Sequence, residues 1–489
     1  MATRCDGAHA TPSPCGRLVA CLPAAHRVRV CLTSSTCEAS EYTTKLPLRE
    51  VSALRWSPEA TLLAIVGGNL VEVIDIDDSH HRIRLDNGSG RLGAIRSAEF
   101  VAEESLLTVW EFGRAMIWDL ITGKGTELGD LKTPTSYALR EGKTLAAILR
   151  HDVLNVWDLK GNCIATGKVS GDPQGLSYCP GGRWIAVTCP QYCETSLQIF
   201  SGDGHRYKGI SNDEGSKRHA IGVKEILWAP DWRFIVLVQG GDGVAMLNTR
   251  TFAVEAVFDA EHGLESEGVK VFQETISSSG QRSYASVSKP FMPPRLEAVA
   301  KTGVVGFSAD GAYLSFRPPE MASSIFIFDV DSRTMQSVII QHSAIKRMTW
   351  HPNPAAALLM IDCGEGVAHL YNAKAPHETP RTVNVTDEAV TANLAWVDNA
   401  IFCVSKSAFW VYQLEGQSHM PASATTMQDQ EEDSLMDMLL AGKSEEKSYT
   451  ERVDYEVNNG EDGSQMMDDT FRNMKQEEGK DPLDDSEIF

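Results

Sequence analysis

The chain has 489 residues and a formal net charge of −21. Its hydrophobic content of 42% and charged content of 23% are ordinary for a globular protein and exclude a wholly disordered chain. The acidic balance argues against a nucleic-acid-binding surface, and no run of about 18 apolar residues predicts a membrane-spanning helix. Eleven cysteines and no recognisable secretory signal indicate reduced thiols.

A short unit recurs along residues 1–414. One copy shows the pattern: Trp56 ends an apolar stretch, the polar turn 57–60 follows, and two further apolar stretches occupy 62–64 and 71–74. Apolar runs separated by polar turns predict consecutive antiparallel strands. Nine copies can be counted, the first beginning at Ser13 and the others anchored at Trp56, Phe100, Leu139, Tyr178, Trp228, Phe307, Trp350 and Trp396.

All but one of the steps between these anchors are 39–50 residues long. From Trp56 to Trp396 the steps are 44, 39, 39, 50, 79, 43 and 46 residues. WD40 propeller blades have four strands and repeat about every 40–45 residues. Trp-Asp pairs at 118–119 and 157–158 match the dipeptide of that repeat. The sequence therefore predicts an all-β WD40 β-propeller with about nine repeat units, forming seven to nine blades, rather than a β-sandwich.

The step of 79 residues between Trp228 and Phe307 leaves room for an inter-blade excursion besides one blade. We place this excursion at residues 259–300, where a Ser-rich stretch and three prolines favour irregular chain. Long connections in compact domains are often either functional or disordered. The candidate partner-binding residues in it are Phe272, Tyr284, Phe291, Met292 and Arg295.

The predicted propeller body is residues 1–414, and the sequence at its two ends predicts too few strands to complete the last blade. The last copy has no fourth strand after Tyr412, because Met420, Pro421 and a polar linker follow. Only about a dozen residues precede the first copy, which is enough for at most a short strand. The sequence alone therefore does not predict that the ring closes.

Residues 415–489 indicate a linker and an acidic disordered tail. From residue 429 onward the chain has 20 Asp or Glu against 6 Lys or Arg, whereas the first 428 residues hold 46 acids and 39 bases. Such a segment buries too little apolar surface to offset its ordering entropy. Within it, 434–442 is either a short helix that a partner's groove would fold or a stray apolar patch. Its candidate partner-binding residues are Leu435, Met436, Leu439 and Leu440.

No motif indicates catalysis or cofactor binding. Residues 88–93 match G-x-G-x-x-G, but a predicted strand follows instead of a helix, which favours a turn between blades. Cys189 and Cys193 lack two further ligands at zinc spacing. His80 and His81, close to Asp75, fit a solvated hairpin. We therefore expect no enzyme activity, no cofactor and no metal.

Three stretches resemble the WD-repeat protein eight family. Residues 303–314 are similar to its G-[IV]-G-x-L-x-F-S-x-D-x-x-[FY]-L stretch, 343–352 to its S-P-V-x-x-x-x-W-x-P segment and 223–230 to its K-S-V-x-W-x-P blade. The proline-containing excursion also falls where that family has one. The resemblance covers roughly residues 13–414 and is sharpest over 223–372.

This resemblance implies a non-catalytic scaffold of the centrosome or spindle pole body, in the cytoplasm and cytoskeleton. Family members are associated in fungi with a coiled-coil anchoring protein and a minus-end-directed kinesin, so it implies protein partners of those kinds. The short N-terminus and the acidic tail depart from the family pattern. A general WD40 adaptor, such as a ubiquitin-ligase substrate receptor or a translation-factor propeller, stays open because fold does not determine function.

Overall fold

The computed structural model divides the chain into two units, Met1–Gln417 and Ser418–Phe489. The acidic tail, with Leu435, Met436, Leu439 and Leu440, lies outside the described residues. The structure describes residues 2–34, 39–78, 81–86, 93–132, 137–140, 143–190, 193, 195–211, 223–239, 243–259, 268–288, 304–386 and 393–414.

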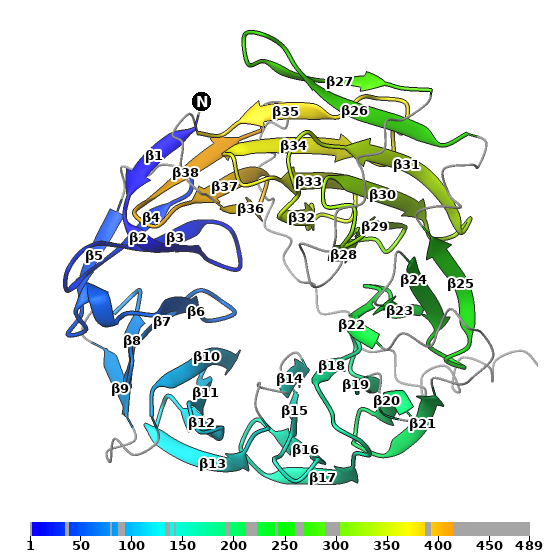
Figure 1. Ribbon diagram of the computed structural model, residues 1–489. Coiled ribbons are helices and arrows are strands. Elements are labelled where there is room, and N and C mark those ends of the chain that lie inside the picture. The colour runs from blue at the N-terminus through cyan, green and yellow to red at the C-terminus, as the bar shows by residue number, and fades with distance from the viewer. Residues whose placement is uncertain are drawn as a thin grey trace, which may run out of the picture. The chain divides into compact units, whose positions relative to one another are not determined.

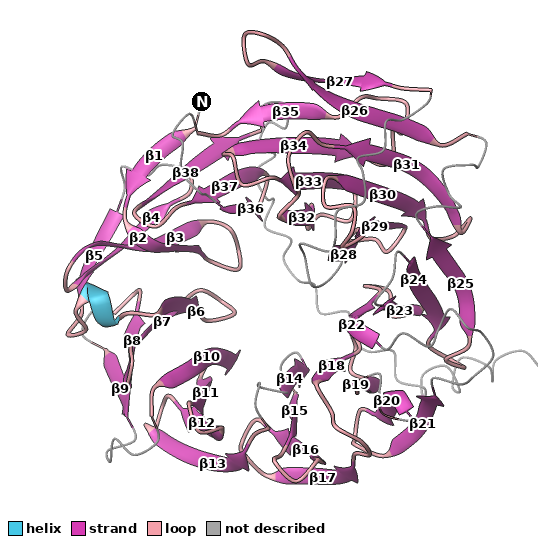
Figure 2. Ribbon diagram, in the orientation of Figure 1, coloured by secondary structure: helices cyan, strands magenta, loops and turns pink. Residues whose placement is uncertain are grey.

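The first unit is a ring of nine small sheets, the blades of a β-propeller (Figure 1). Figure 2 shows strands and connecting loops throughout the described chain, and η1 (Leu48–Glu50) is a single 3-10 turn. The predicted all-β propeller is therefore confirmed, with nine blades.

Within each blade the strands follow one another outward from the ring centre. Blade 1 has β2 (Ala8–Pro12), β3 (Leu18–Ala24), β4 (Arg27–Leu32) and β5 (Ala39–Thr43). Blade 2 has β6 (Ala53–Trp56), β7 (Leu62–Val66), β8 (Leu70–Asp75) and β9 (Arg82–Asp86). Blade 3 has β10 (Ile95–Ala102), β11 (Ser105–Trp110), β12 (Arg114–Asp119) and β13 (Lys124–Asp130).

The next three blades repeat this order. Blade 4 has β14 (Tyr137–Arg140), β15 (Thr144–Ile148), β16 (Val153–Asp158) and β17 (Cys163–Lys168). Blade 5 has β18 (Gly175–Tyr178), β19 (Trp184–Thr188), β20 (Thr195–Ser201) and β21 (Arg206–Ser211). Blade 6 has β22 (Val223–Trp228), β23 (Phe234–Gln239), β24 (Gly243–Asn248) and β25 (Val254–Asp259).

The last three blades include the two exceptions to this order. Blade 7 has β28 (Val304–Phe307), β29 (Tyr313–Arg317), β30 (Ser324–Asp329) and β31 (Thr334–Ile340), followed outward by two earlier strands, β26 (Lys270–Ile276) and β27 (Arg282–Ser286). Blade 8 has β32 (Arg347–Trp350), β33 (Leu358–Asp362), β34 (Val367–Asn372) and β35 (Arg381–Asn384). Blade 9 has β36 (Asn393–Val397), β37 (Ala400–Val404), β38 (Ala408–Gln413) and, outermost, β1 (Thr3–Asp6).

The core lies between neighbouring blades. The middle strands are buried on both faces, as in β19, where every residue is buried. This explains why they are nearly continuous apolar runs in the sequence. One cluster, for example, joins Val28 of blade 1 to Leu63 and Ile74 of blade 2.

Four of the predicted anchors are tryptophans, and each one hydrogen-bonds its own blade to the preceding blade. In each case the indole N–H donates a hydrogen bond to the inner strand of the preceding blade. A buried indole needs such a partner, which gives the recurring tryptophan a physical reason. The pairs are Trp56 to the Thr11 carbonyl oxygen (3.0 Å), Trp228 to Ser177 Oγ (3.1 Å), Trp350 to the Gly306 carbonyl oxygen (3.1 Å) and Trp396 to the Thr349 carbonyl oxygen (3.0 Å).

Ring closure, which the sequence left without a prediction, is achieved by the two ends of the unit. β1 pairs antiparallel with β38, with Thr3 opposite Val411 and Asp6 opposite Ala408. Cys5 of β1 packs against the cluster that holds Phe409. Four residues of strand are enough because β38 supplies the paired edge.

The expectation of irregular chain across 259–300 is wrong for its described part. Residues 270–286 form an antiparallel hairpin, β26 and β27, with Phe272 opposite Ser286. β26 also pairs in parallel with β31, so the hairpin adds two strands outside blade 7 (Figure 1). Residues 289–303, with Phe291, Met292 and Arg295, lie outside the described residues.

Candidate functional site

The candidate site is the hairpin of residues 270–286, called the outer hairpin from here on. It is the outermost part of blade 7 and also contacts blade 8, where Thr382 Oγ1 of β35 donates to the Arg282 carbonyl oxygen at 3.3 Å. Most outer strands in this ring belong to a single blade. The outer hairpin is therefore a bridge between two blades.

Apolar side chains on both faces of β26 anchor the hairpin. Val271 joins a core cluster shared by blades 6 and 7. Phe272 points the other way, is 1% exposed, and packs in a cluster with Ile339 and Tyr371, its ring centroid 5.9 Å from that of Tyr371. Alternate residues of a strand face opposite sides, so β26 is buried on both.

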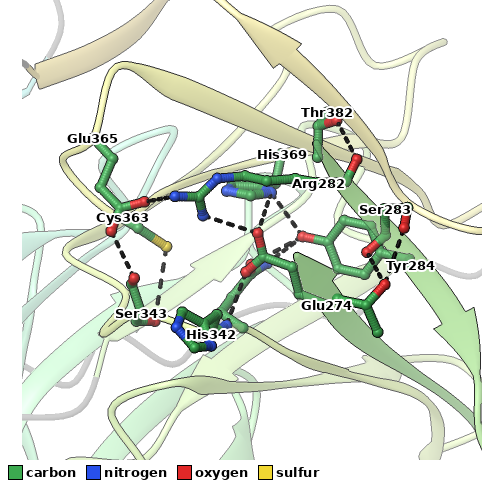
Figure 3. Close-up of polar contacts among 12 residues, drawn as sticks. Glu274, Arg282, Ser283, Tyr284, His342, Ser343, Cys363, Glu365, His369 and Thr382 are labelled. Carbon is green, nitrogen blue, oxygen red and sulfur yellow. Dashed lines mark hydrogen bonds and ion pairs between the residues drawn. The ribbon is translucent and has the colours of Figure 1, made fainter. Parts of the chain in front are cut away.

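A buried carboxylate follows these apolar residues. The side chain of Glu274 is 0% exposed. One of its oxygens accepts from Arg282 Nη1 at 2.9 Å, and the other accepts the backbone N–H of His342 at 2.8 Å (Figure 3). A buried charge is tolerated only when paired and hydrogen-bonded, and both conditions hold here.

Arg282 connects Glu274 to blade 8. Its Nη2 also donates to Glu365, on the turn between β33 and β34. Glu365 in turn accepts from Ser343 Oγ at 2.6 Å. The guanidinium, 19% exposed, therefore lies between one carboxylate of the hairpin and one of the next blade (Figure 3).

Tyr284 and His369 form the second half of the network. Gln341 Nε2 donates to the Tyr284 hydroxyl oxygen at 2.7 Å. This hydroxyl lies 2.8 Å from Nδ1 of His369 (Figure 3). His369 is on β34 of blade 8 and its side chain is 0% exposed. The hydroxyl also donates to Gln341 Oε1 at 2.9 Å, so it is held between Gln341 and His369.

The pKa shifts of the network agree with this arrangement. Burial lowers the pKa of His369 below its usual value, against the opposing effect of Glu274. Burial, reinforced by the Glu274 carboxylate, raises the pKa of Tyr284 well above its usual range. Burial acts to raise the pKa of Glu365, but the Ser343 hydrogen bond and the Arg282 charge outweigh it, and the net shift is downward. The lowered pKa of His369 favours a neutral imidazole, and the lowered pKa of Glu365 favours its carboxylate form.

This arrangement is suited to bracing the structure. Glu274 and His369 have no exposed side-chain surface, so neither can reach a substrate in solution. Their contacts fix the hairpin against blades 7 and 8. In the outer strand β27, Ser283, Ala285 and Ser286 are exposed, and no strand of the described chain pairs with its outer edge.

The structure places two of the predicted hairpin residues. Phe272 is a core residue that joins blades 7 and 8, and Tyr284 is partly buried with its hydroxyl directed at His369. Both side chains hold the hairpin in place, and the exposed surface comes from their neighbours. Sequence reasoning missed Glu274, Arg282, Glu365 and His369, because a lone acid or base in a sequence shows no partner until the chain is folded.

The other motifs considered in the sequence are described in part. Cys189 is buried and Gln198 Nε2 donates to its sulfur at 3.3 Å. The Asp75 carboxylate accepts the backbone N–H groups of Asp77 and Asp78, an ordinary turn contact. Residues 87–92 and His80 lie outside the described residues. Over the part of the chain that is described, no three His, Cys, Asp or Glu gather as metal ligands, and no helix is long and apolar enough to cross a membrane.

Comparisons with known proteins agree with this fold. No protein-family model matches the chain. The mouse WD repeat-containing protein WRAP73 is 21% identical over 351 residues, which cover 62% of this chain and 73% of that protein. An uncharacterized WD repeat-containing protein of Schizosaccharomyces pombe is 24% identical over 259 residues, 48% of this chain and 51% of that protein. A solved structure of a eukaryotic initiation factor, 11% identical, has a TM-score of 0.51 and covers 83% of this chain and 90% of its own.

The fold defines the class of protein: a nine-bladed β-propeller. Within that class the chain is similar in sequence to WD repeat-containing proteins, of which mouse WRAP73 is one.

Proposed function

We propose that this protein is a non-catalytic scaffold at the spindle pole or microtubule-organising centre. In this role it binds a coiled-coil anchoring protein and, through it, a minus-end-directed kinesin. The observation that carries the proposal is the outer hairpin, a rigid element braced across two blades. It lies inside residues 223–372, the region with the sharpest resemblance to the spindle-pole family described above.

The exposed side of the hairpin is suited to protein contact. Ile276 is 39% exposed, and Thr275 beside it is also exposed. The free edge of β27 offers backbone donors and acceptors next to this apolar side chain. Recognition commonly occurs on elements that project from a rigid scaffold, because such elements lose little entropy on binding.

Net charge supports attachment through another protein. The first 428 residues hold 46 acids and 39 bases, and the remainder is more acidic still. Like charges repel, so an acidic chain is poorly suited to direct binding of the acidic microtubule lattice. A coiled-coil anchor would supply the link that the propeller lacks.

Imaging and purification of the tagged full-length chain from mitotic cells test the proposal. We expect a focused signal at the poles and co-purification of a coiled-coil pole protein with a minus-end-directed motor. Diffuse signal with recovery of only ligase or ribosomal components would instead favour a ubiquitin-ligase receptor or a translation-factor propeller.

A matched pair of variants tests the hairpin itself. Ile276→Asp places a charge on the hairpin, whereas Ile164→Asp places the same charge on β17, where Ile164 is 53% exposed. We expect the first to lose the coiled-coil partner and the second to keep it. Equal binding by both variants would remove the outer hairpin from the interface.

A further inference from the structure

A second surface lies on another part of the ring, at the inner strands of blades 4 and 5. A cavity of about 400 Å³ opens where β14 and β18 end. Arg140, Lys143, Tyr178 and Pro180 are among the residues that line it. Arg140 and Lys143 belong to the first turn of blade 4, and Pro180 to the first turn of blade 5.

Among the described residues, the two cations at this cavity have no counter-charge. Neither Arg140 nor Lys143 makes a side-chain hydrogen bond or an ion pair with any residue that the structure describes. Lys143 and Pro180 are exposed, and Arg140 is half-buried. Asp203, on the third turn of blade 5, is already engaged by Ser201 and by His205, whose Nε2 lies 3.8 Å away.

The turn of blade 5 keeps Arg140 at the cavity. Gly182 has a φ of +71°, a conformation that side chains disfavour. A Cβ atom at Gly182 would overlap the guanidinium of Arg140. The glycine therefore provides both the turn and the space in which Arg140 lies.

A cluster of aromatic side chains lies next to this turn and includes residues of blades 5 and 6. The Trp184 ring centroid lies 4.7 Å from that of Tyr207 and 5.4 Å from that of Phe252. Trp184 and Phe252 are buried, whereas Tyr207 is 54% exposed. Trp232, on the first turn of blade 6, is 47% exposed. Arg183 is exposed, follows Gly182 in the chain and lies over the Trp184 ring at 5.3 Å.

Unpaired cations beside exposed aromatic rings fit one kind of ligand. Cations at a cavity bind carboxylate or phosphate groups, and exposed aromatic rings bind apolar side chains. The cations stand out because the propeller around them carries more acids than bases. A short peptide offers both an anionic group and an apolar group when an acidic or phosphorylated residue is close in sequence to an apolar residue.

We propose that this surface binds an anionic peptide segment of a partner protein. The carboxylate of Asp or Glu, or the phosphate of phosphoserine or phosphothreonine, enters the cavity between Arg140 and Lys143. A neighbouring apolar side chain of the peptide packs on Tyr207. The surface is separate from the outer hairpin, so its role goes beyond the scaffold function proposed above.

Fluorescence polarisation with the full-length chain tests this binding. The probes are three short labelled peptides that share one Phe and differ only in its neighbours, which are Glu, phosphoserine or Asn. We expect the Glu or phosphoserine peptide to bind at least about tenfold more tightly than the Asn peptide, as one charge-assisted contact provides. Binding of the Glu peptide identifies a carboxylate ligand, and binding of the phosphoserine peptide alone identifies a phosphate ligand.

Matched variants locate the site. Arg140→Gln with Lys143→Gln removes both cations of the cavity, and Lys346→Gln with Arg347→Gln removes two exposed cations of blade 8. We expect the first pair, and separately Tyr207→Ser, to weaken binding about tenfold, and the blade 8 pair to leave it unchanged.

Two results would overturn the proposal: equal affinity for all three peptides, or equal losses in the cavity and blade 8 variants. Circular dichroism of each variant checks that the propeller remains folded. Localisation at the poles is a separate readout, because it depends on the outer hairpin and not on this surface.

Discussion

The outer hairpin and the blade 4–5 cavity are both rich in charge, but they differ in whether those charges have partners. Arg282 is 19% exposed and contacts two carboxylates, Glu274 and Glu365. Lys143 is exposed and Arg140 is half-buried at the open cavity, and neither has an ion-pair partner among the described residues. An unpaired charge is costly when buried and cheap when exposed. The hairpin is therefore an internal brace, whereas the cavity has charges that remain open to a ligand.

The largest expected effect comes from removing the paired arginine. Arg282→Met leaves Glu274 buried without its counter-charge, and we expect the hairpin to lose about 3–5 kcal/mol of local stability. Arg140→Met, the matched change at the cavity, should cost less than about 0.5 kcal/mol. Hydrogen exchange of the β26 and β27 amides measures the first value, and exchange of β14 the second.

A similar loss of local stability in Arg282→Met and Arg140→Met would contradict the difference between a paired and an unpaired arginine. It would mean either that solvent already reaches Glu274 or that Arg140 has a structural partner. Glu274→Gln combined with Arg282→Met separates these cases, because the double variant removes the buried charge and should recover part of the loss.

A smaller effect is expected from removing one hydroxyl. Tyr284→Phe deprives Gln341 and His369 of their hydrogen-bond partner inside the protein, and we expect a loss of about 1–3 kcal/mol from the hairpin. Tyr207→Phe removes an exposed hydroxyl and should change stability by less than about 0.5 kcal/mol. Thermal unfolding together with hydrogen exchange measures both, and equal effects would place the Tyr284 hydroxyl in contact with solvent.

The smallest effect is a dependence on pH that only the hairpin should show. The pKa of buried His369 is lowered below its ordinary value of 6.5, so the opened hairpin binds a proton more readily than the closed one. Stability from this group is fully present above pH 6.5 and is lost as the pH falls toward the lower folded value. The lowered pKa of Glu365 adds a further loss at more acidic pH.

Hydrogen exchange of β27 at several pH values, corrected for intrinsic rates, follows this loss. His369→Gln should remove the step that begins near neutral pH and retain the more acidic one. His351 on blade 8 is also buried with a lowered pKa, so a step that persists in the variant would be assigned to His351.

Much of the propeller could be predicted from local pattern alone. Trp228 and Trp350 mark ends of inner strands, and apolar runs such as 234–238 mark buried middle strands. Period and strand content depend on residues close together in the chain, so they are visible in the sequence. The hairpin strands were missed because β27 is short and polar, and its neighbour pairs with a strand that comes much later.

The sequence by itself determined a nine-unit, all-β repeat with an acidic C-terminal segment, because apolar spacing and charge are local properties. Only the tertiary structure decided that β1 completes blade 9, since Thr3 and Val411 meet across the whole length of the propeller. It also decided which charges are paired: Arg282 meets Glu365, 83 residues away, while Arg140 meets no acid among the described residues. Strand pairing and ion pairing depend on contacts between segments far apart in the chain, and such contacts cannot be predicted from a local sequence pattern.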